Sequence, residues 1–549
     1  MISFIKRAAI LPLMALSITA HAQQNTSTEY TLTIIHNNDV HARLDQVTMS
    51  GSSCTTKDAE AQKCYGGFAR MAGMINQIRQ QKATLPLLVL NAGDFFQGSL
   101  FYTYYKSAAL WPFVNYIKFD AVTLGNHEFD NGVAELVQFL NNSKDLNMVV
   151  ANINTQQEPN LNKFIKKSLV INQKGEKIGI IGLITVDTPI LSSPGSTVTF
   201  QELKNSLETE VKVLEAQGVN KIIALTHIGL AEDIKLAETV RGVDVYIGGH
   251  SHSLQSNQRK EAVAPYPIVV KTPSGDPALV AQAYYAGIYL GNLEVTFNDK
   301  GVPVRWQGEP ILLDHTVPQD QQVLSMVKEL SEPLQVFRQR QVGTTETELV
   351  GSREICRHQE CNLGNLISDA LLFATQKQKT QIAFQNGGGI RTSIPKGPIN
   401  YGQILEVLPF SNSVSVFGLK GSDVKLALEN GVSRAESTTN EGTGRFLQVS
   451  GLRYSWDATK PVGSRILSIE VKTANGQFVL LDEQATYVVV TNDFLRAGGD
   501  GFSVFKEKAI NPIDNGMNLE EALSSYIQHL LDNKTLVSPA VEGRIKRQN

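Results

Sequence analysis

Carboxylate, amide and imidazole side chains recur in the first half of the chain, each time directly after a short aliphatic run. They are Asp39 and His41, Asp94, Asn126 and His127, His227, and His250 with His252. Such groups bind divalent ions such as zinc or manganese. One carboxylate shared by two ions can hold them roughly 3.5–4 Å apart, a spacing suited to activating water and stabilising a transferred phosphoryl group. These residue types therefore point to metal-assisted phosphoester hydrolysis.

The aliphatic runs predict the strands that position these side chains. They cover residues 31–35, 87–90, 121–124, 148–153, 177–184, 221–225 and 243–247. Helical stretches alternate with the runs up to about Asn298, which is typical of a layered α/β domain. Ligands bind outside the carboxyl ends of strands in such sheets, so we expect the side chains to meet at one rim. A single Asp or His after a strand is more often a turn former or helix cap, but five such segments in one domain favour a metal site.

A second domain is predicted beyond a connecting helix. The stretch 318–340 is polar and favours a helix, with Val323, Met326, Leu330 and Leu334 at three-to-four spacing. Beyond it, residues 382–384, 414–419 and 487–491 predict further strands among glycine-rich turns. We therefore expect a metal-binding domain over 23–317, a linker helix over 318–340 and a substrate-binding domain over 341–549.

The first residues predict export. Lys6 and Arg7 precede an apolar run over 8–18 and the small-x-small site Ala20-His21-Ala22, so 1–22 is predicted to be a cleaved signal peptide. A membrane anchor is the alternative, but a spanning helix needs about 20 apolar residues. The polar C-terminus is unlike a lipid-anchor signal. We expect a protein that is periplasmic or secreted, with no membrane span or lipid anchor.

Charge and cysteine content narrow the classes further. The 50 Lys+Arg and 53 Asp+Glu residues give a formal net charge of -3, which argues against a nucleic acid polymer as partner. The 4 cysteines form two locally close pairs, Cys54 with Cys64 and Cys356 with Cys361. In an oxidising compartment these pairs suit two disulfides. A zinc site is the alternative, which the lack of nearby histidines disfavours.

Several segments resemble the signature blocks of the calcineurin-like metallophosphoesterases. They are His36-Asn37-Asn38-Asp39-Val40-His41, Asn91-Ala92-Gly93-Asp94, Gly125-Asn126-His127-Glu128-Phe129-Asp130, Thr226-His227-Ile228-Gly229 and Gly248-Gly249-His250-Ser251-His252. Within that superfamily the chain is similar to the 5'-nucleotidase family over nearly all of its mature length. The animal ecto-enzymes are nearest, and the bacterial periplasmic UDP-sugar hydrolases are also similar. The resemblance implies an N-terminal four-layer α/β β-sandwich domain and a C-terminal α/β domain joined by a helix.

The resemblance also implies a ligand set for two divalent ions. Asp39, His41 and His252 would hold one ion, Asn126, His227 and His250 the other, with Asp94 bridging. The family usually has Asn or Gln where His252 stands. Zinc is favoured, with manganese, cobalt or magnesium as alternatives.

His127 resembles the catalytic histidine of the family. It would face the phosphoryl oxygens, and Asp130 would orient it and favour its protonated form. The alternative is that His127 merely packs beside Asn126, but the three-residue spacing lets one turn bring the carboxylate to the imidazole.

The second domain would supply the substrate contacts. Asn386 and Arg391, in the block Asn386-Gly387-Gly388-Gly389-Ile390-Arg391, would contact phosphate, as would Arg357. Phe410 and Phe494 resemble the aromatic clamp for the base, and Asp500 the ribose ligand. Otherwise Arg357 would form a surface ion pair and the phenylalanines would be core residues.

We interpret the chain as an exported 5'-nucleotidase that hydrolyses nucleoside 5'-monophosphates, AMP first, by in-line attack of metal-bound hydroxide. A nucleoside di- or triphosphate, a UDP-sugar or a dinucleotide is the alternative substrate for the same centre. A non-catalytic nucleotide-binding or adhesive surface protein is the alternative of another class. The oligomeric state is left open.

Overall fold

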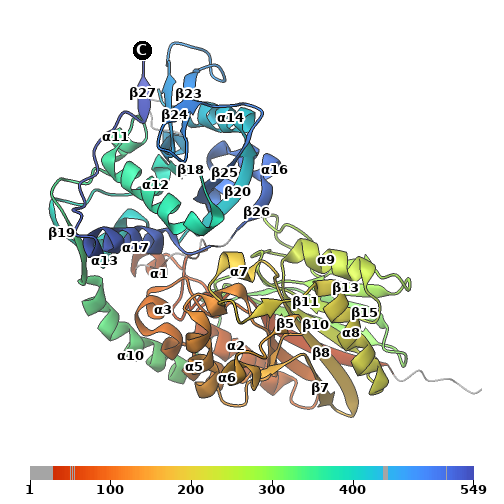
Figure 1. The fold of residues 1–549 in the computed structure, drawn as a ribbon. Coiled ribbons are helices and arrows are strands. Elements are labelled where there is room, and N and C mark those ends of the chain that lie inside the picture. The colour runs from red at the N-terminus through yellow and green to blue at the C-terminus, as the bar shows by residue number, and fades with distance from the viewer. Residues whose placement is uncertain (1–28, 50, 52, 55, 437–442, 515) are drawn as a thin grey trace, which may run out of the picture.

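The computed structural model describes residues 29–549 except 50, 52, 55, 437–442 and 515, so the predicted signal peptide lies outside the described residues. Two α/β domains lie against each other, and α10 (Gln321–Arg338) runs along one side between them (Figure 1). Among the described residues, no helix combines the length and apolar character needed to cross a membrane.

The first sheet of the N-terminal domain is built around parallel strands. Its order is β15-β14-β1-β2-β3-β4-β6, with β16 also paired to β14. The parallel strands are β1 (Tyr30–Asn37), β2 (Leu87–Asn91), β3 (Ala121–Val122), β4 (Met148–Val149) and β6 (Ile165–Lys166). The antiparallel edge is formed by β14 (Tyr289–Phe297), β15 (Pro303–Gly308) and β16 (Ile311–Leu312). Strands β1 and β2 are largely buried, which explains their continuous apolar runs.

The second sheet has the order β12-β13-β11-β10-β8-β7. Its parallel strands are β8 (Glu176–Ile184), β10 (Ile222–His227), β11 (Val245–Ile247) and β13 (Pro277–Ala281). The antiparallel edges are β7 (Ser168–Gln173) and β12 (Ile268–Lys271).

The run 148–153 is not one strand but two short ones. It forms β4 and then β5 (Ile153–Asn154), which pairs with β9 (Thr199–Phe200). Between them, the Asn152 side chain donates to Ile184 O at 2.7 Å and accepts from Ile184 N at 2.9 Å. These bonds take the place of ladder pairing and break the strand.

The two sheets pack face to face between outer layers of helices, which confirms the predicted four-layer sandwich. Their shared core includes Leu32, Ile34, Leu88 and Leu90 from the first sheet and Ile180, Ile223, Leu225 and Val245 from the second. The helices α2 (Phe68–Gln81), α4 (Trp111–Ile117), α5 (Gly132–Asn142) and α10 cover the first sheet. The second is covered by α8 (Leu203–Ala216) and α9 (Leu230–Thr239).

The connecting helix α10 begins at a strong cap. Asp320 accepts hydrogen bonds from the backbone N–H groups of Gln322 and Val323, both at 3.1 Å. Val323, Val327 and Leu334 are buried against the first domain. The packed stripe explains why this polar stretch forms a helix despite the internal Pro333.

The C-terminal domain is a separate α/β unit around a sheet of order β21-β18-β25-β20-β26. Its strands are β18 (Ile382–Asn386), β20 (Val414–Lys420), β21 (Leu447–Ser450), β25 (Thr486–Asn492) and β26 (Ile510–Ile513). One face packs on α12 (Asn362–Ala374), α13 (Tyr401–Val407) and α17 (Leu519–Asp532), the other on α14 (Gly421–Val432) and α16 (Ser503–Lys508). A smaller sheet has the order β24 (Phe478–Leu480), β23 (Ile466–Lys472), β22 (Leu452–Trp456) and β27 (Ile545–Arg547), and β17 (Gln341–Thr345) pairs with β19 (Gly397–Asn400).

Short helices link these elements. They are α1 (Thr56–Glu60), α3 (Leu100–Tyr105), α6 (Pro159–Asn162), α7 (Thr188–Leu191), α11 (Arg353–Cys356) and α15 (Asp493–Arg496), with 3-10 turns η1 (Lys106–Ala109), η2 (Asn126–Phe129), η3 (Gln376–Gln378), η4 (Gly387–Gly389), η5 (Thr443–Arg445) and η6 (Gly499–Gly501).

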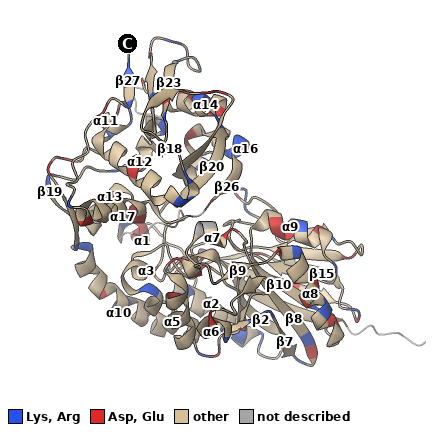
Figure 2. Ribbon diagram, in the orientation of Figure 1, with Lys and Arg blue, Asp and Glu red and all other residues tan. Residues whose placement is uncertain are grey.

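Both cysteine pairs are disulfides, Cys54–Cys64 with Cα atoms 5.9 Å apart and Cys356–Cys361 with Cα atoms 5.2 Å apart. Acidic and basic residues are interspersed over both domains (Figure 2).

Candidate active site

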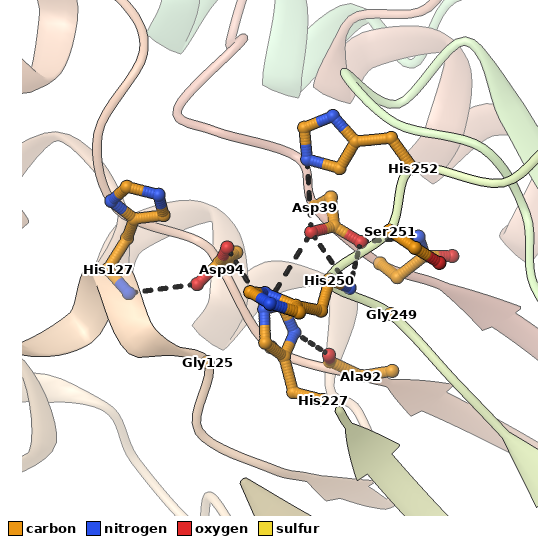
Figure 3. A network of polar contacts seen from close by, with 12 residues as sticks. Asp39, Ala92, Asp94, Gly125, His127, His227, Gly249, His250, Ser251 and His252 are labelled. Carbon is orange, nitrogen blue, oxygen red and sulfur yellow. Dashed lines mark hydrogen bonds and ion pairs between the residues drawn. The ribbon is translucent and has the colours of Figure 1, made fainter. Parts of the chain in front are cut away.

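Acidic and imidazole groups from the two sheets meet at one rim of the sandwich, where β1, β2, β3, β10 and β11 end (Figure 3). His227 Nε2 lies 3.1 Å from Asp94 Oδ2 and 3.8 Å from Asp39 Oδ1. His252 Nε2 lies 3.3 Å from Asp39 Oδ1, and His41 Nε2 is 3.8 Å from Asp94 Oδ2. Side chains more than two hundred positions apart in the chain therefore form a single cluster.

Backbone carbonyls fix the orientation of two of the imidazoles. His227 Nδ1 is 2.7 Å from Ala92 O, and His41 Nδ1 is 3.2 Å from Phe96 O. A carbonyl can only accept, so each Nδ1 carries a proton and each Nε2 is the ring atom that faces the carboxylates. This is the arrangement of imidazoles that bind metal ions.

Several of these residues have a left-handed backbone. The φ angles are 49° at Asp39, 47° at His41, 58° at Asp94, 80° at His250 and 49° at His252. Residues with a Cβ rarely adopt this conformation, and it persists where the surrounding structure imposes it, commonly at functional sites. The strained backbone is therefore independent evidence that this rim is functional.

Two glycines allow the loops to approach this closely. A Cβ on Gly125 would fall on the carboxylate of Asp94, and one on Gly249 would lie 2.7 Å from Ala92 O and 3.0 Å from Asp39 Oδ2. Any larger residue at either position would displace the clustered side chains.

The electrostatics keep the carboxylates ionised. Burial opposes the charge of Asp39, but His252 and His227 outweigh it and lower the pKa of Asp39 to about 2. Burial likewise opposes the charge of Asp94, but His227 and His127 hold its pKa well below the usual range. Two buried anions among imidazoles are a fitting cradle for cations.

The donor set also fits divalent ions. The groups Asp39/His41/His252 and Asp39/Asp94/His227 each offer ligand atoms within 4.8 Å of one another. Asn126 is fully buried, and its side-chain amide makes no hydrogen bond to any described residue. Orphaned polar atoms are costly inside a protein unless a ligand satisfies them. The residues here therefore suit divalent metal ions.

His127 stands at the edge of this cluster. Its Nδ1 is 2.7 Å from Asp130 Oδ2, and the Ser192 hydroxyl donates to Asp130 Oδ1 at 2.7 Å. Its backbone N–H donates to Asp94 Oδ1 at 3.0 Å. The contact with Asp130 fixes the orientation of the His127 ring beside the cluster.

A single cavity of about 1000 Å³ joins this cluster to the C-terminal domain. Its lining includes His41, His127, His250 and His252 from one domain and Arg357, Asn386, Arg391, Phe410, Phe494 and Asp500 from the other. The structure thus brings the predicted substrate-binding residues to the same space as the predicted metal ligands.

Arg357 lies on a tightly held loop. The Cys356–Cys361 disulfide closes the loop, and the Gln448 side chain donates to Cys356 O at 2.9 Å and accepts from Cys361 N at 3.0 Å. Burial and the like charge of Arg353 lower the pKa of Arg357 from its ordinary value. The loop therefore presents a buried cation to the cavity.

The other residues predicted to bind substrate are more exposed to solvent. Phe410 is 39% exposed and Phe494 is 45% exposed, although both are large and apolar. The Arg391 guanidinium lies over the Phe410 ring, 5.4 Å from its centroid, and Asn386 Nδ2 donates to Asp500 Oδ2 at 2.9 Å. Exposed aromatic faces beside cations and a carboxylate suit a ligand with a base, a sugar and a phosphate.

Sequence reasoning missed four residues of this site. Arg43, Tyr284 and Tyr285 line the cavity, and the Tyr285 ring stacks on His252 with centroids 4.9 Å apart. No local pattern marks these three, because they reach the cavity through tertiary packing. Glu128 is buried beneath it. It belongs to the block Gly125-Asn126-His127-Glu128-Phe129-Asp130, which marked its position but not the role of its side chain.

Comparison with known proteins agrees with this geometry. A calcineurin-like phosphoesterase model matches residues 32–254, and a 5'-nucleotidase C-terminal domain model matches residues 341–507. The snake venom 5'-nucleotidase of Crotalus adamanteus is 36% identical over 94% of this chain and 88% of its own length. The 5'-nucleotidase of Homo sapiens is 35% identical over 94% of this chain and 90% of its own length.

Solved structures are similar over almost the whole chain. A 5'-nucleotidase precursor from Thermus thermophilus is 42% identical, with a TM-score of 0.59, over 95% of this chain and 100% of that chain. The NAD nucleotidase of Haemophilus influenzae is 25% identical, with a TM-score of 0.79, over 95% of this chain and 99% of that chain. With both domains matched and relatives at 35–36% identity aligned over 94% of its length, this chain belongs to the 5'-nucleotidase family.

Proposed function

We propose that this chain hydrolyses nucleoside 5'-monophosphates, AMP foremost, to a nucleoside and phosphate. The observation that carries the proposal is the single cavity shared by a carboxylate–imidazole cluster and a set of arginine and phenylalanine side chains. Hydrolysis of a nucleoside phosphate needs both groups of side chains, the first to bind the reacting phosphate and the second to bind the base. The names of the relatives point to the same reaction.

We assign one ion to Asp39, His41 and His252, the other to Asn126, His227 and His250, and the bridge to Asp94. The fixed Nε2 positions and the ionised carboxylates support this assignment. When bound, the two ions supply an activated water and stabilise the charge on the phosphoryl group. Zinc is the proposed metal, because four imidazoles contribute to the set and zinc favours nitrogen ligands.

His127 is the proposed catalytic histidine. The 2.7 Å contact with Asp130 favours the protonated imidazole, and Ser192 holds that carboxylate in place. A protonated ring at the cavity edge can donate from Nε2 to a phosphoryl oxygen as its negative charge grows. Asp130 then acts by orientation and charge.

The C-terminal domain is proposed to bind the rest of the substrate. Arg357, Arg391 and Asn386 would hold the phosphate, since guanidinium groups pair with phosphate oxygens in two-point contacts. The half-exposed rings of Phe410 and Phe494 would stack on the base. Asp500 would accept hydrogen bonds from the ribose hydroxyls.

We propose the same organisation as the sequence predicts: a metal-binding domain over 23–317, a linker helix over 318–340 and a substrate-binding domain over 341–549. The extent of the two family matches and the position of α10 support these boundaries. Export to the periplasm or the medium is proposed from the two disulfides, because such bonds persist in oxidising compartments. Fractionation of the source cells would test it.

The test of the function is a phosphate-release assay on purified protein. Metal-free protein is reloaded with zinc, manganese, cobalt or magnesium and offered AMP, ADP, ATP and UDP-glucose. We expect the fastest release from AMP, with one nucleoside formed per phosphate, and none while excess chelator is present. Metal-dependent turnover of the other substrates without turnover of AMP would contradict the proposal.

Dinucleotide hydrolysis is the second candidate. The cavity of about 1000 Å³ is at the upper end of the roughly 300–1,000 Å³ of ordinary ligand pockets, which leaves space beyond a mononucleotide. The similarity to a NAD nucleotidase points the same way. Adding NAD to the assay distinguishes the two, because cleavage of its pyrophosphate yields AMP before any phosphate is released.

A further inference from the structure

Glu128 is a fully buried carboxylate that contacts four backbone amides. Its Oε2 accepts from Asp94 N at 3.0 Å and from Gly125 N at 2.6 Å. Its Oε1 accepts from Phe95 N at 2.7 Å and from Phe96 N at 3.1 Å. Glu128 does not line the cavity, so any effect it has on the site must pass through these four hydrogen bonds.

The four bonds tie together two loops that the sheet leaves unpaired. The ladder between β2 and β3 ends with the pair Asn91 and Val122. Asp94 lies beyond the end of β2, and Asn126 and His127 lie beyond the end of β3. Beyond the last strand pair, hydrogen bonds to Glu128 connect the two loops in place of strand pairing. These loops carry the proposed bridging ligand and the proposed catalytic histidine.

The bonds also support a strained backbone. Asp94 has φ of 58°, in the left-handed region that residues with a Cβ adopt infrequently. The Glu128 carboxylate binds the N–H groups of Asp94 and the next two residues, which holds this turn in place. The returning contact from His127 N to Asp94 Oδ1 at 3.0 Å closes the link between the loops.

A neutral side chain of the same shape cannot make this set of contacts. An ionised carboxylate has about four lone-pair sites, whereas glutamine replaces one oxygen with an N–H₂ donor. In Glu128→Gln that donor would face two backbone N–H groups and leave them unsatisfied. Buried donors without acceptors destabilise the local structure that contains them.

We propose that Glu128 is a positioning residue that sets the separation between Asp94 and the Asn126–His127 turn. It thereby controls metal affinity and turnover rather than substrate binding. The inference rests on the proposed function for the roles of those three residues.

The test compares Glu128→Gln with a matched control, Asp120→Asn. Asp120 also accepts from a backbone amide of β2, Val89 N at 2.7 Å, but at the start of β3, away from the cluster. Metal affinity is measured without substrate, by competition with a chelator and elemental analysis, and kcat and KM for AMP are measured on reloaded protein. Thermal unfolding of each metal-free variant reports on folding.

We expect Glu128→Gln to weaken binding of at least one ion by about 10- to 100-fold, the range found when partners of metal ligands are removed. The kcat should fall while KM for AMP stays within about twofold, again because the change acts through the ligands. Asp120→Asn should keep the metal affinity of the unaltered protein. A Glu128→Gln protein with a lower Tm but unchanged metal affinity and kcat would overturn the proposal.

Glu128→Asp covers the case in which Glu128→Gln does not fold, since it keeps the charge but draws the carboxylate back by one methylene. Weakened metal binding in folded Glu128→Asp supports the proposal, and unchanged metal binding and kcat overturn it. If the unaltered protein hydrolyses no phosphate ester, the proposed function fails, whereas the metal titrations still decide the role of Glu128.

Discussion

The two walls of the cavity are built in different ways. On the metal side, Asp39 and His227 are fully buried and Asp94 is 1% exposed. On the substrate side, Phe410 and Phe494 are 39% and 45% exposed. The metal side is held by many short hydrogen bonds within one domain, whereas few contacts hold the rings of Phe410 and Phe494. The difference fits the proposed roles, with preorganised metal ligands on one side and, on the other, substrate contacts that adapt to the ligand.

The walls also differ in backbone strain. Five proposed metal ligands have positive φ, whereas on the substrate side this holds for Asp500 alone among the six proposed contacts in the described chain. A strained conformation survives only where many contacts impose it, so changes on the metal side should have larger effects. The predictions below test that ranking, from the largest effect to the smallest.

Asp94→Ala should have the largest effect. It removes the proposed bridge, so both ions should bind more weakly. Enzymes accelerate reactions by at least about 10⁶-fold, and here that acceleration depends on the ions. Activity should therefore fall by more than about 10⁴-fold. Elemental analysis and phosphate release from AMP measure the two losses. Asp299→Ala, at an exposed carboxylate, is the control. Near-normal activity in Asp94→Ala would remove the basis for the metal assignment.

His127→Ala should lower kcat by about 10²- to 10⁴-fold, the range for a positioned acid–base group. The ions should remain bound, because His127 lies outside the assigned ligand set. Metal content and kcat measured on the same sample separate the two effects, and exposed His315→Ala serves as control. Loss of metal together with activity would instead make His127 a ligand.

Phe494→Ala and Phe410→Ala should act mainly on binding. Stacking on a base contributes about 1–3 kcal/mol, so KM for AMP should rise about 5- to 150-fold with a smaller change in kcat. An aryl phosphate without a nucleoside should keep its KM. Equal losses on both substrates would argue against stacking and against an adaptable substrate wall.

Glu521→Gln should have the smallest effect. Gln97 Nε2 donates to Glu521 Oε2 at 2.6 Å and Thr103 Oγ1 to Glu521 Oε1 at 3.1 Å, and these bonds join the two domains. Weakening them should change kcat and KM together by less than about tenfold, because domain separation governs substrate entry and release. Small-angle scattering reports the spread of the domains, and Lys425→Ala, which breaks an exposed ion pair, is the control. No change in either readout would show that these bonds do not hold the walls together.

Much of the metal side could be predicted from the sequence. Aliphatic runs mark parallel strands, and residues such as Asp94 and His227 follow them directly, so their meeting at one rim follows from the geometry of α/β sheets. The four-layer fold and both disulfides were predicted correctly. Two runs differ from the prediction: the strand in 121–124 is limited to Ala121–Val122, and 148–153 is divided where the side chain of Asn152 replaces backbone pairing.

Contacts that depend on packing over long separations could not be predicted. The pairing of β1 with β14 and the bond between Gln97 and Glu521 join residues hundreds of positions apart, and no periodicity encodes either. Tyr284 and Tyr285 reach the cavity in the same way. Glu128 was within a recognised block, but its role becomes visible only when the partners of its two oxygens are known.

The core shared by the two sheets has a consequence for distant mutations. Asp94 follows a strand of one sheet, and His227 ends a strand of the other. The thickness of the apolar layer between the sheets therefore determines the distance between these two side chains. Ile34 and Ile180 belong to that layer. Removal of one methyl group from either side chain would shift one sheet against the other. The distance between the proposed metal ligands would then change, although the substitution lies far from them.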